Sequence, residues 1–182
     1  MAVTFLADES GGANTLQVFH INLNCTNLER TIAFYELLGF RVVNEFDQTQ
    51  PGEKAPSFAE IGLGPVLGLA HDCEARAALM ALTDDPRGIR LDLIEWQNPK
   101  SEPTTRTDLA QIGFGRLCLK SRDAWAMHRR LVEAGRSPYS EPTLITMGGT
   151  SQWVFCCEDP DGIVVEFMQF LRAGSPTTAP GS

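Results

Sequence analysis

The first repeating feature of the chain is a short alternating segment followed by an amphipathic one. Residues 16–24 (LQVFHINLN) alternate between apolar and polar positions well enough to predict a strand. Asn27 is placed to cap a helix after it, and Gly39 suits a left-handed stop. The apolar positions between them recur at helical spacing and predict a buried stripe of Leu28, Ile32, Tyr35 and Leu38. FRVVNEF then reads as a second strand.

The same layout returns about a hundred residues later. Residues 113–120 (GFGRLCLK) predict a strand, and Ser121 or Asp123 can cap the helix that follows. That helix is expected from 124 to 134, with Gly135 as its stop. Because the order of strand, cap, helix and glycine is repeated, the pattern predicts two copies of one supersecondary unit.

A later pair of stretches extends the repeat. MALTDDPRGIRLDLIEW (80–96) and VFCCEDPDGIVVEFMQF (154–170) both read as strand, D-P-x-G turn and strand. The turns align Asp85 with Asp159. Asp92 then matches Glu166, and Glu95 matches Gln169. Each copy is therefore predicted to run β-α-β-β-β, which makes the chain an α+β protein of two tandem modules.

These boundaries divide the 182-residue chain into five parts. They are an N-terminal extension (1–15), a first module (16–99), a linker (100–111), a second module (112–171) and a disordered tail (172–182). The first module holds 22 more residues between its matched positions, so a long loop with one short helix is expected at 47–75. Loops of this length often serve as lids or binding loops.

Composition removes several classes of function. The net charge is −8, and the longest basic run is Arg129-Arg130, which argues against a nucleic-acid partner. No apolar run is long enough to predict a membrane span, and the N-terminus does not read as a secretory signal. Five cysteines with no C-x-x-C spacing are expected to be reduced. A cytoplasmic protein is the resulting expectation.

Strand alternation sorts side chains onto two faces, because residues two apart point the same way. The apolar sets, including Leu91, Leu93, Leu117 and Leu119, should pack beneath the helices, and Phe19, Trp153 and Phe155 are also expected in the core. The opposite, inward-facing set consists of Val18, His20, Asn22, Asn24, Arg90, Asp92, Ile94, Trp96, Phe114, Arg116, Cys118, Lys120, Val164, Glu166, Met168 and Phe170. His71 is expected in a loop, and His128 on the second helix, outside the inward-facing set.

The paired modules, the HINL strand, the AFYELLGF helix end and the DPDGIVVEF ending resemble the vicinal oxygen chelate superfamily over residues 16–171. That group includes glyoxalase I, methylmalonyl-CoA epimerase, extradiol dioxygenases and bleomycin-resistance proteins. The resemblance implies that the eight strands of two modules curve into an open, cup-like mixed sheet with the helices outside. It also implies a homodimer. The fold hosts enzymes and non-enzymes alike.

The resemblance further implies that the first and last strands of each module present ligands to a divalent metal. Carried over by position, these are His20, Asp92, Arg116 and Glu166. His20, Asp92 and Glu166 would suit Zn, Fe, Mn, Co or Ni, whereas Glu95 falls outside the set. Arg116 stands where a second histidine is expected, and a guanidinium only donates hydrogen bonds. The site would hold no metal if Arg116 pairs with Glu166.

Three functions stay open at this stage. The first is a lyase, isomerase or epimerase for a small oxygenated metabolite, with Glu166 and His20 moving protons and Arg116 holding the substrate anion. Substrate contacts would come from Arg116, Asn22, Trp96, Cys118, Met168 and Phe170. The second is a metal-free protein that binds an antibiotic-like compound, and Arg116 favours it. The third, a dioxygenase, is disfavoured because the inner face offers one histidine where two are required. Arg116 can equally form a plain structural salt bridge, with Glu166 or Asp92 as its partner.

Overall fold

The structure is a computed structural model. It describes residues 18–45, 48–50, 53–54, 57–85, 88–102, 109–110, 112–172, 174–175 and 177–179. The predicted N-terminal extension lies outside these ranges, as do parts of the predicted linker, long loop and tail. Of the helices described, none is long and apolar enough to cross a membrane.

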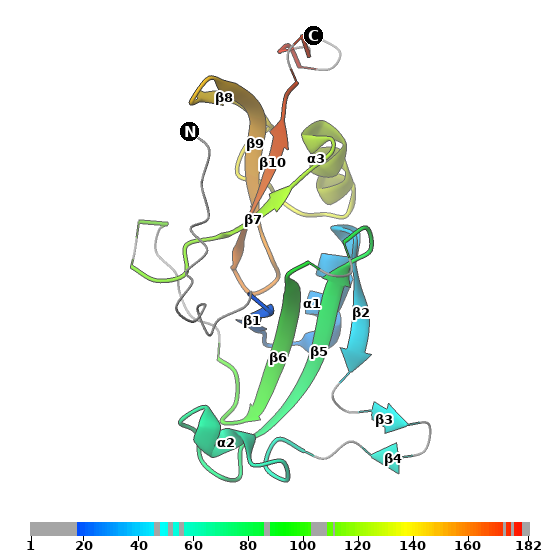
Figure 1. Ribbon diagram of the computed structural model, residues 1–182, viewed down its shortest axis with the longest axis vertical. Coiled ribbons are helices and arrows are strands. Elements are labelled where there is room, and N and C mark those ends of the chain that lie inside the picture. The colour runs from blue at the N-terminus through cyan, green and yellow to red at the C-terminus, as the bar shows by residue number, and fades with distance from the viewer. Residues whose placement is uncertain are drawn as a thin grey trace, which may run out of the picture.

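Two βαβββ modules are present, as predicted, and each forms a four-stranded mixed sheet (Figure 1). The first module consists of β1 (His20–Asn24), α1 (Leu28–Leu37), β2 (Phe40–Glu45), β5 (Glu74–Leu82) and β6 (Arg90–Asn98), in the sheet order β1-β6-β5-β2. The second consists of β7 (Leu117–Lys120), α3 (Ala124–Glu133), β8 (Thr143–Met147), β9 (Thr150–Glu158) and β10 (Val164–Phe170), in the order β7-β10-β9-β8.

The repeat holds in the pairing of the strands. In each module the first strand runs parallel to the last, and the other neighbours are antiparallel. The predicted fold class is confirmed, and each module has the four strands predicted for it. The eight strands, however, lie in two separate four-stranded sheets, one beyond the other along the molecule (Figure 1). β1 and β7 are therefore edge strands.

Both module helices begin and end where the sequence predicts. Asn27 caps α1 by accepting from the backbone N–H of Arg30 at 2.8 Å. Asp123, rather than Ser121, caps α3 by accepting from Ala126 N at 2.9 Å. Gly39 and Gly135 have φ of 96° and 74° at the helix ends, a backbone region that favours glycine.

The main core lies between the helices and the outer sheet faces. Leu91, Leu93 and Phe167 are at most 1% exposed, as alternation predicts, and Phe155 stacks on Phe167 with ring centroids 4.7 Å apart. Trp153 is also buried. The buried face of α1 also includes Phe34 and Thr31, which were not among the buried positions predicted for this helix.

The prediction that Phe19 packs in the core is wrong. Phe19 is 52% exposed, and its ring lies under the Arg90 guanidinium at 5.0 Å. β1 begins only at His20, so Phe19 precedes the sheet at an open edge and alternation no longer assigns it a buried side. His71 is exposed in a loop, as expected. His128 lies on α3 and contacts the core residue Phe155, on the face of the sheet that the helix covers and therefore outside the cup, as expected.

The long insertion builds more structure than the one short helix predicted. It contains β3 (Gln48–Gln50), β4 (Glu53–Lys54) and α2 (Leu63–Val66). Phe58 and Cys73 from this segment form a second apolar cluster with Ala77 and Ile94. Ile94 lies on the inward-facing side of β6, so the insertion covers part of the inner face of the first sheet.

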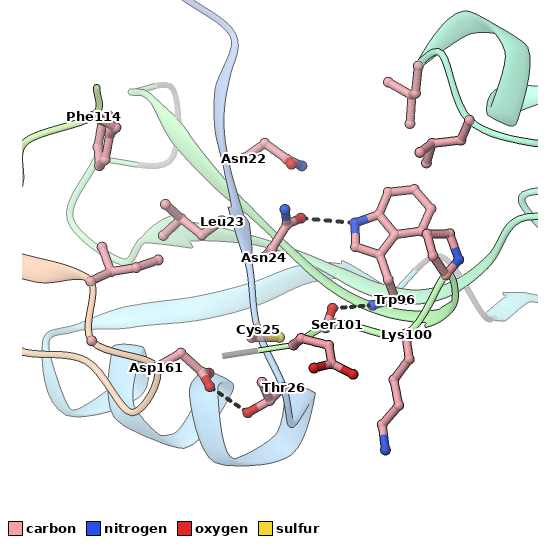
Figure 2. Close-up of a pocket in the computed structure, with 16 residues that line it drawn as sticks. Asn22, Leu23, Asn24, Cys25, Thr26, Trp96, Lys100, Ser101, Phe114 and Asp161 are labelled. Carbon is pink, nitrogen blue, oxygen red and sulfur yellow. Dashed lines mark hydrogen bonds between the residues drawn. The ribbon is translucent and has the colours of Figure 1, made fainter. Parts of the chain in front are cut away.

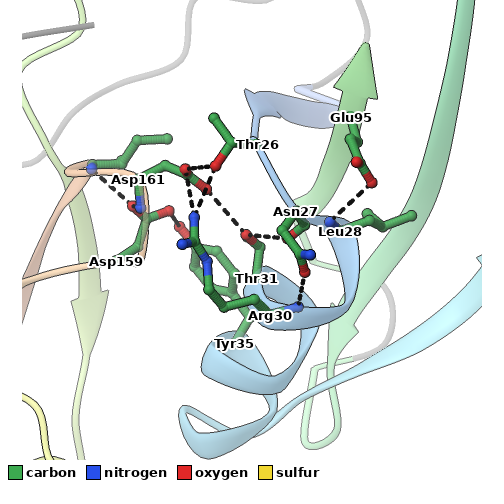
Figure 3. Close-up of polar contacts among 10 residues, drawn as sticks. Thr26, Asn27, Leu28, Arg30, Thr31, Tyr35, Glu95, Asp159 and Asp161 are labelled. Atoms are coloured by element: carbon green, nitrogen blue, oxygen red, sulfur yellow. Dashed lines mark hydrogen bonds and ion pairs between the residues drawn. The ribbon is translucent and has the colours of Figure 1, made fainter. Parts of the chain in front are cut away.

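A polar network joins the two modules (Figure 3). The turn between β9 and β10 carries Asp159 and Asp161 to the start of α1. Tyr35 Oη donates to Asp159 Oδ2 at 3.2 Å, and Arg30 Nη2 lies 2.7 Å from Asp161 Oδ1. Thr31 Oγ1 donates to Asp161 Oδ2 at 3.3 Å. We call this contact the module latch.

The two carboxylates of the module latch differ in environment. Burial raises the pKa of Asp159, although backbone N–H groups of Ile163 and Asp161 and the Tyr35 hydroxyl oppose the rise. Burial also pushes the pKa of Asp161 upward, but hydrogen bonds from Thr26 and the charge of Arg30 lower it overall. Asp85, which matches Asp159 in the first module, is exposed on a turn. The repeat is thus symmetric in its strands and asymmetric in its turns.

Candidate functional site

The first group of predicted site residues lies where β1 pairs with β6. The register places Asn22 opposite Asp92. Asn22 Nδ2 donates to Asp92 Oδ2 at 2.9 Å, and His20 Nε2 lies 3.9 Å from the same oxygen. Burial raises the pKa of Asp92, while the Asn22 hydrogen bond and the nearby His20 partly oppose it. Asp92 Oδ1 is buried with no hydrogen-bond partner among the described residues.

The second group lies where β7 pairs with β10. Arg116 Nε is 3.0 Å from Glu166 Oε1, and the Glu166 side chain is 12% exposed. Glu166 pairs in register with Cys118 on one side and Cys156 on the other. Burial raises the pKa of Cys118 to about 11, with a further contribution from Glu166, so this thiol stays protonated near neutral pH.

The two groups occupy separate sheets, and no hydrogen bond or ion pair joins them in the described part of the chain. Asp92 is influenced by Asn22 and His20, whereas Arg116 is influenced by Glu166, Cys156 and Cys118. Among the described residues no three His, Cys, Asp or Glu side chains gather closely enough to hold a metal ion. Each chain therefore presents two half-sites: the His20 half-site (His20, Asn22 and Asp92) and the Arg116 half-site (Arg116, Cys118, Cys156 and Glu166).

The donor chemistry does not fit a metal centre. A ligand carboxylate must offer lone pairs to the ion, but Glu166 is paired with a guanidinium that keeps its proton, because the hydrogen bond and charge of Glu166 raise the pKa of Arg116. A metal ion beside Arg116 would also meet a like charge. The metal set of His20, Asp92 and Glu166 stays a prediction, without support from this arrangement.

Glu95 and Gln169, the other matched pair, have structural roles. Glu95 Oε2 accepts from Leu28 N at 3.1 Å, at the first residue of α1. Gln169 Oε1 accepts from Ala124 N at 2.8 Å, at the first residue of α3. Both side chains thus satisfy a helix N-terminus in their own module.

A pocket of about 690 Å³ opens next to the His20 half-site (Figure 2). It is bordered by β1, the end of β6, the insertion, the start of the linker and the β9–β10 turn. Asn22 and Trp96, both predicted to contact substrate, line it. Arg116, Cys118, Met168 and Phe170 do not line it, and Phe170 instead lies under Lys120 at 5.8 Å. We call this cavity the Trp96 pocket.

Sequence reasoning missed most of the walls of the Trp96 pocket. Leu67 and Leu69 come from the insertion, Lys100 and Ser101 from the linker, and Ile163 from the β9–β10 turn. The only signal available in the sequence was the unusual length of segment 47–75. Its packing against Trp96 through Phe58, with ring centroids 5.6 Å apart, required the folded chain.

Paired βαβββ modules, each forming a four-stranded mixed sheet, define the class of fold to which this protein belongs. The family model of the Glyoxalase/Bleomycin resistance protein/Dioxygenase superfamily matches residues 17–167. The chain belongs to this superfamily. No curated protein matches it.

Solved structures support the fold. A glyoxalase family protein from Bacillus cereus is similar with a TM-score of 0.69 and 17% identity, over 91% of this chain and 100% of that one. The antibiotic-binding protein TnmS3 from Streptomyces sp. CB03234 gives 0.55 and 19%, over 88% and 100%. The trypanothione-dependent glyoxalase I of Leishmania major gives 0.54 and 15%, over 85% and 87%. At these identities the likeness concerns the fold alone.

Proposed function

We propose that this protein binds a small oxygenated anion without a metal and uses Arg116 as the anchor. The observation that carries the proposal is the geometry of the Arg116–Glu166 pair. Glu166 contacts Nε at 3.0 Å, and within the described chain neither Nη atom has an ion-pair partner. The Arg116 side chain is 47% exposed, so these nitrogens remain accessible to a ligand. A guanidinium fork suits a carboxylate or enolate.

The proposal includes a second copy of the chain. β1 and β7 are edge strands, and each borders one half-site. A homodimer that brings the His20 half-site of one copy to the Arg116 half-site of another would join the two inner faces into one cup. This expectation follows the family's architecture, and the separation of the half-sites within one chain supports it.

An enzyme is the second candidate, and the environment of Asp92 favours it. Asp92 has a raised pKa because of burial, and His20 Nε2 lies 3.9 Å from its carboxylate. A carboxyl group of raised pKa beside an imidazole can move a proton next to a carbonyl group. The lyase, isomerase or epimerase expected from the sequence would then rely on His20 and Asp92. Glu166 is engaged in the ion pair with Arg116, so His20 and Asp92 carry the proton transfer in this alternative.

Thermal-shift titration with salicylate, which carries vicinal oxygens and a carboxylate, tests the binding proposal. Wild type is expected to be stabilised in proportion to RT ln(1 + [L]/Kd). Arg116→Gln should lose this shift, whereas Arg122→Gln, at a surface arginine 88% exposed, should retain it. Equal shifts in both variants would contradict the role of Arg116. So would a stoichiometric metal that salicylate binding requires and that His20→Ala removes.

The enzyme is tested by proton exchange rather than by binding. Dihydroxyacetone in D₂O should exchange its carbon-bound protons faster with wild type than without protein, as followed by NMR. His20→Ala and Asp92→Asn should each abolish the acceleration. An exchange rate equal to that of the protein-free solution would leave the binding protein as the supported function.

A further inference from the structure

The Trp96 pocket is distinct from the anion anchor. Its walls include Asn22, which also bonds to Asp92, but none of His20, Asp92, Arg116 or Glu166 lines it. Its volume of about 690 Å³ falls within the range of cavities that take one drug-sized molecule. The pocket therefore adjoins the His20 half-site and has room for a separate chemical group.

The aromatic wall of this pocket is fixed in place. Trp96 Nε1 donates to Asn24 Oδ1 at 3.0 Å, and the Trp96 backbone N–H donates to Ser101 Oγ at 3.0 Å (Figure 2). The Phe58 ring meets the indole edge-on at 5.6 Å. Trp96 remains half-buried, so part of its indole stays accessible. A preorganised indole favours a flat aromatic partner, because stacking costs little further ordering.

Polar groups beside the indole define the rest of the ligand. Within the described chain, Asn22 Oδ1 and Asn24 Nδ2 have no hydrogen-bond partner, which leaves one acceptor and one donor near the ring. Lys100 and Glu102 contribute opposite charges to the lining. The charge of Asp161 is taken up by Arg30. This balance offers little to an ionic ligand and suits a neutral one with a hydroxyl or carbonyl group.

The insertion closes the apolar side of the pocket. Leu67 and Leu69 lie in its lining, and Leu69 N donates to Gly64 O at 2.8 Å. A side chain on Gly64 would approach Ala70 O to 2.1 Å, so glycine allows this tight return of the chain. The position of the two leucines is therefore set by the local backbone of the insertion.

We propose that the Trp96 pocket binds a neutral, flat aromatic molecule, or the aromatic part of a larger ligand, that carries a hydroxyl or carbonyl group. This deepens the proposed function by naming a second subsite beside the anion anchor. It rests on that function only insofar as both subsites serve one ligand.

Isothermal titration of the full chain with 1-naphthol tests the proposal, with decahydro-1-naphthol as a non-planar control of the same skeleton. We expect the Kd for 1-naphthol to be at least tenfold lower. Leu67 lines the pocket and is 49% exposed, and Leu67→Asp should raise the Kd for 1-naphthol at least tenfold. Val66→Asp is the matched control, because Val66 is next to Leu67 in the chain, is 78% exposed and does not line the pocket. This variant should change the Kd for 1-naphthol less than twofold.

The subsite would be overturned by equal affinity for the planar and non-planar alcohols, or by equal effects of the two aspartate variants. Arg116→Gln should leave 1-naphthol binding unchanged, because this probe has no anionic group. Loss of 1-naphthol binding in that variant would also contradict the separate subsite. If 1-naphthol binds and salicylate does not, the proposed anion anchor is rejected and the aromatic subsite is retained. If salicylate binds and 1-naphthol does not, only the aromatic subsite is rejected.

Discussion

Replacing Asp161 with Asn is expected to loosen the module latch. The Asp161 side chain is 8% exposed and accepts hydrogen bonds from Thr26, Arg30 and Thr31 (Figure 3). Asn keeps the shape and one acceptor oxygen but removes the charge. The bonds from Thr26 and Arg30 to Oδ1 can remain without their charge assistance, whereas an amide nitrogen in the place of Oδ2 cannot accept from Thr31.

The magnitude follows from exposure. Arg30 is 46% exposed, so its ion pair with Asp161 contributes at most about 1 kcal/mol after solvent screening. The part-buried bond from Thr26 to a charged rather than a neutral acceptor adds about 1 kcal/mol. We expect a loss of about 1–2 kcal/mol, which for a chain of this size lowers Tm by about 2–8 °C.

Asp84→Asn is the matched control for differential scanning calorimetry. Asp84 Oδ2 lies 3.0 Å from Arg122 Nη2 and also joins the two modules, but the side chains are 73% and 88% exposed. Its loss should stay below about 0.5 kcal/mol. If both variants lose equally, burial does not set the strength of the module latch and the reasoning is refuted.

The deficit of Asp161→Asn should depend on pH. The pKa of Asp161 is lowered in the folded state, so its charge stabilises the fold above the unfolded value near 3.8. That contribution is lost as pH falls through the lower folded value. The free energy of unfolding of the variant should therefore fall below that of wild type by the full amount at pH 6, and the two should become similar near pH 2. A deficit that persists unchanged at acid pH would contradict an electrostatic origin.

Three further outcomes are expected. Glu95→Ala and Gln169→Ala should each lower the free energy of unfolding by about 1 kcal/mol, measured by urea denaturation, because a helix N-terminus loses its acceptor, while salicylate affinity stays unchanged. The pKa of Asp159 is raised by burial, so the folded wild-type protein loses stability as pH rises and this aspartate is deprotonated. The Tm of Asp159→Asn should therefore increase relative to the Tm of wild type between pH 3 and pH 7 in thermal melts. Phe58→Ala should cost about 3 kcal/mol and weaken 1-naphthol binding in calorimetry, since it removes the ring that supports Trp96; an unchanged 1-naphthol affinity would show that Phe58 does not hold the indole in place.

Local patterns determined the modules. The helical spacing after Asn27 and after Asp123, and the glycines that follow, depend on interactions a few residues apart, and these elements formed where predicted. The D-P-x-G turns fixed the register that matches Glu95 with Gln169. Alternation then assigned Leu93 and Phe167 to the core correctly, because side-chain direction along a strand is a local property.

Strand alternation gave a wrong prediction just before the start of β1. Phe19 lies one residue before β1, and only the extent of the ladder decides whether it packs. The pairing of Arg116 with Glu166 was one of several partnerships open from the sequence, since Asp92 was an equal candidate. The register of β7 against β10, and the placement of Asp92 in the other sheet, selected Glu166.

Long-range packing decided the rest of the site. Asp159 and Asp85 hold matching places in the repeat, yet only Asp159 is buried, because its turn meets Tyr35 of the other module. The Trp96 pocket likewise draws its walls from segments far apart in the chain. The sequence by itself determined which side chains face inward in each module. The tertiary structure alone decided which of them meet, since docking depends on surfaces that no local pattern encodes.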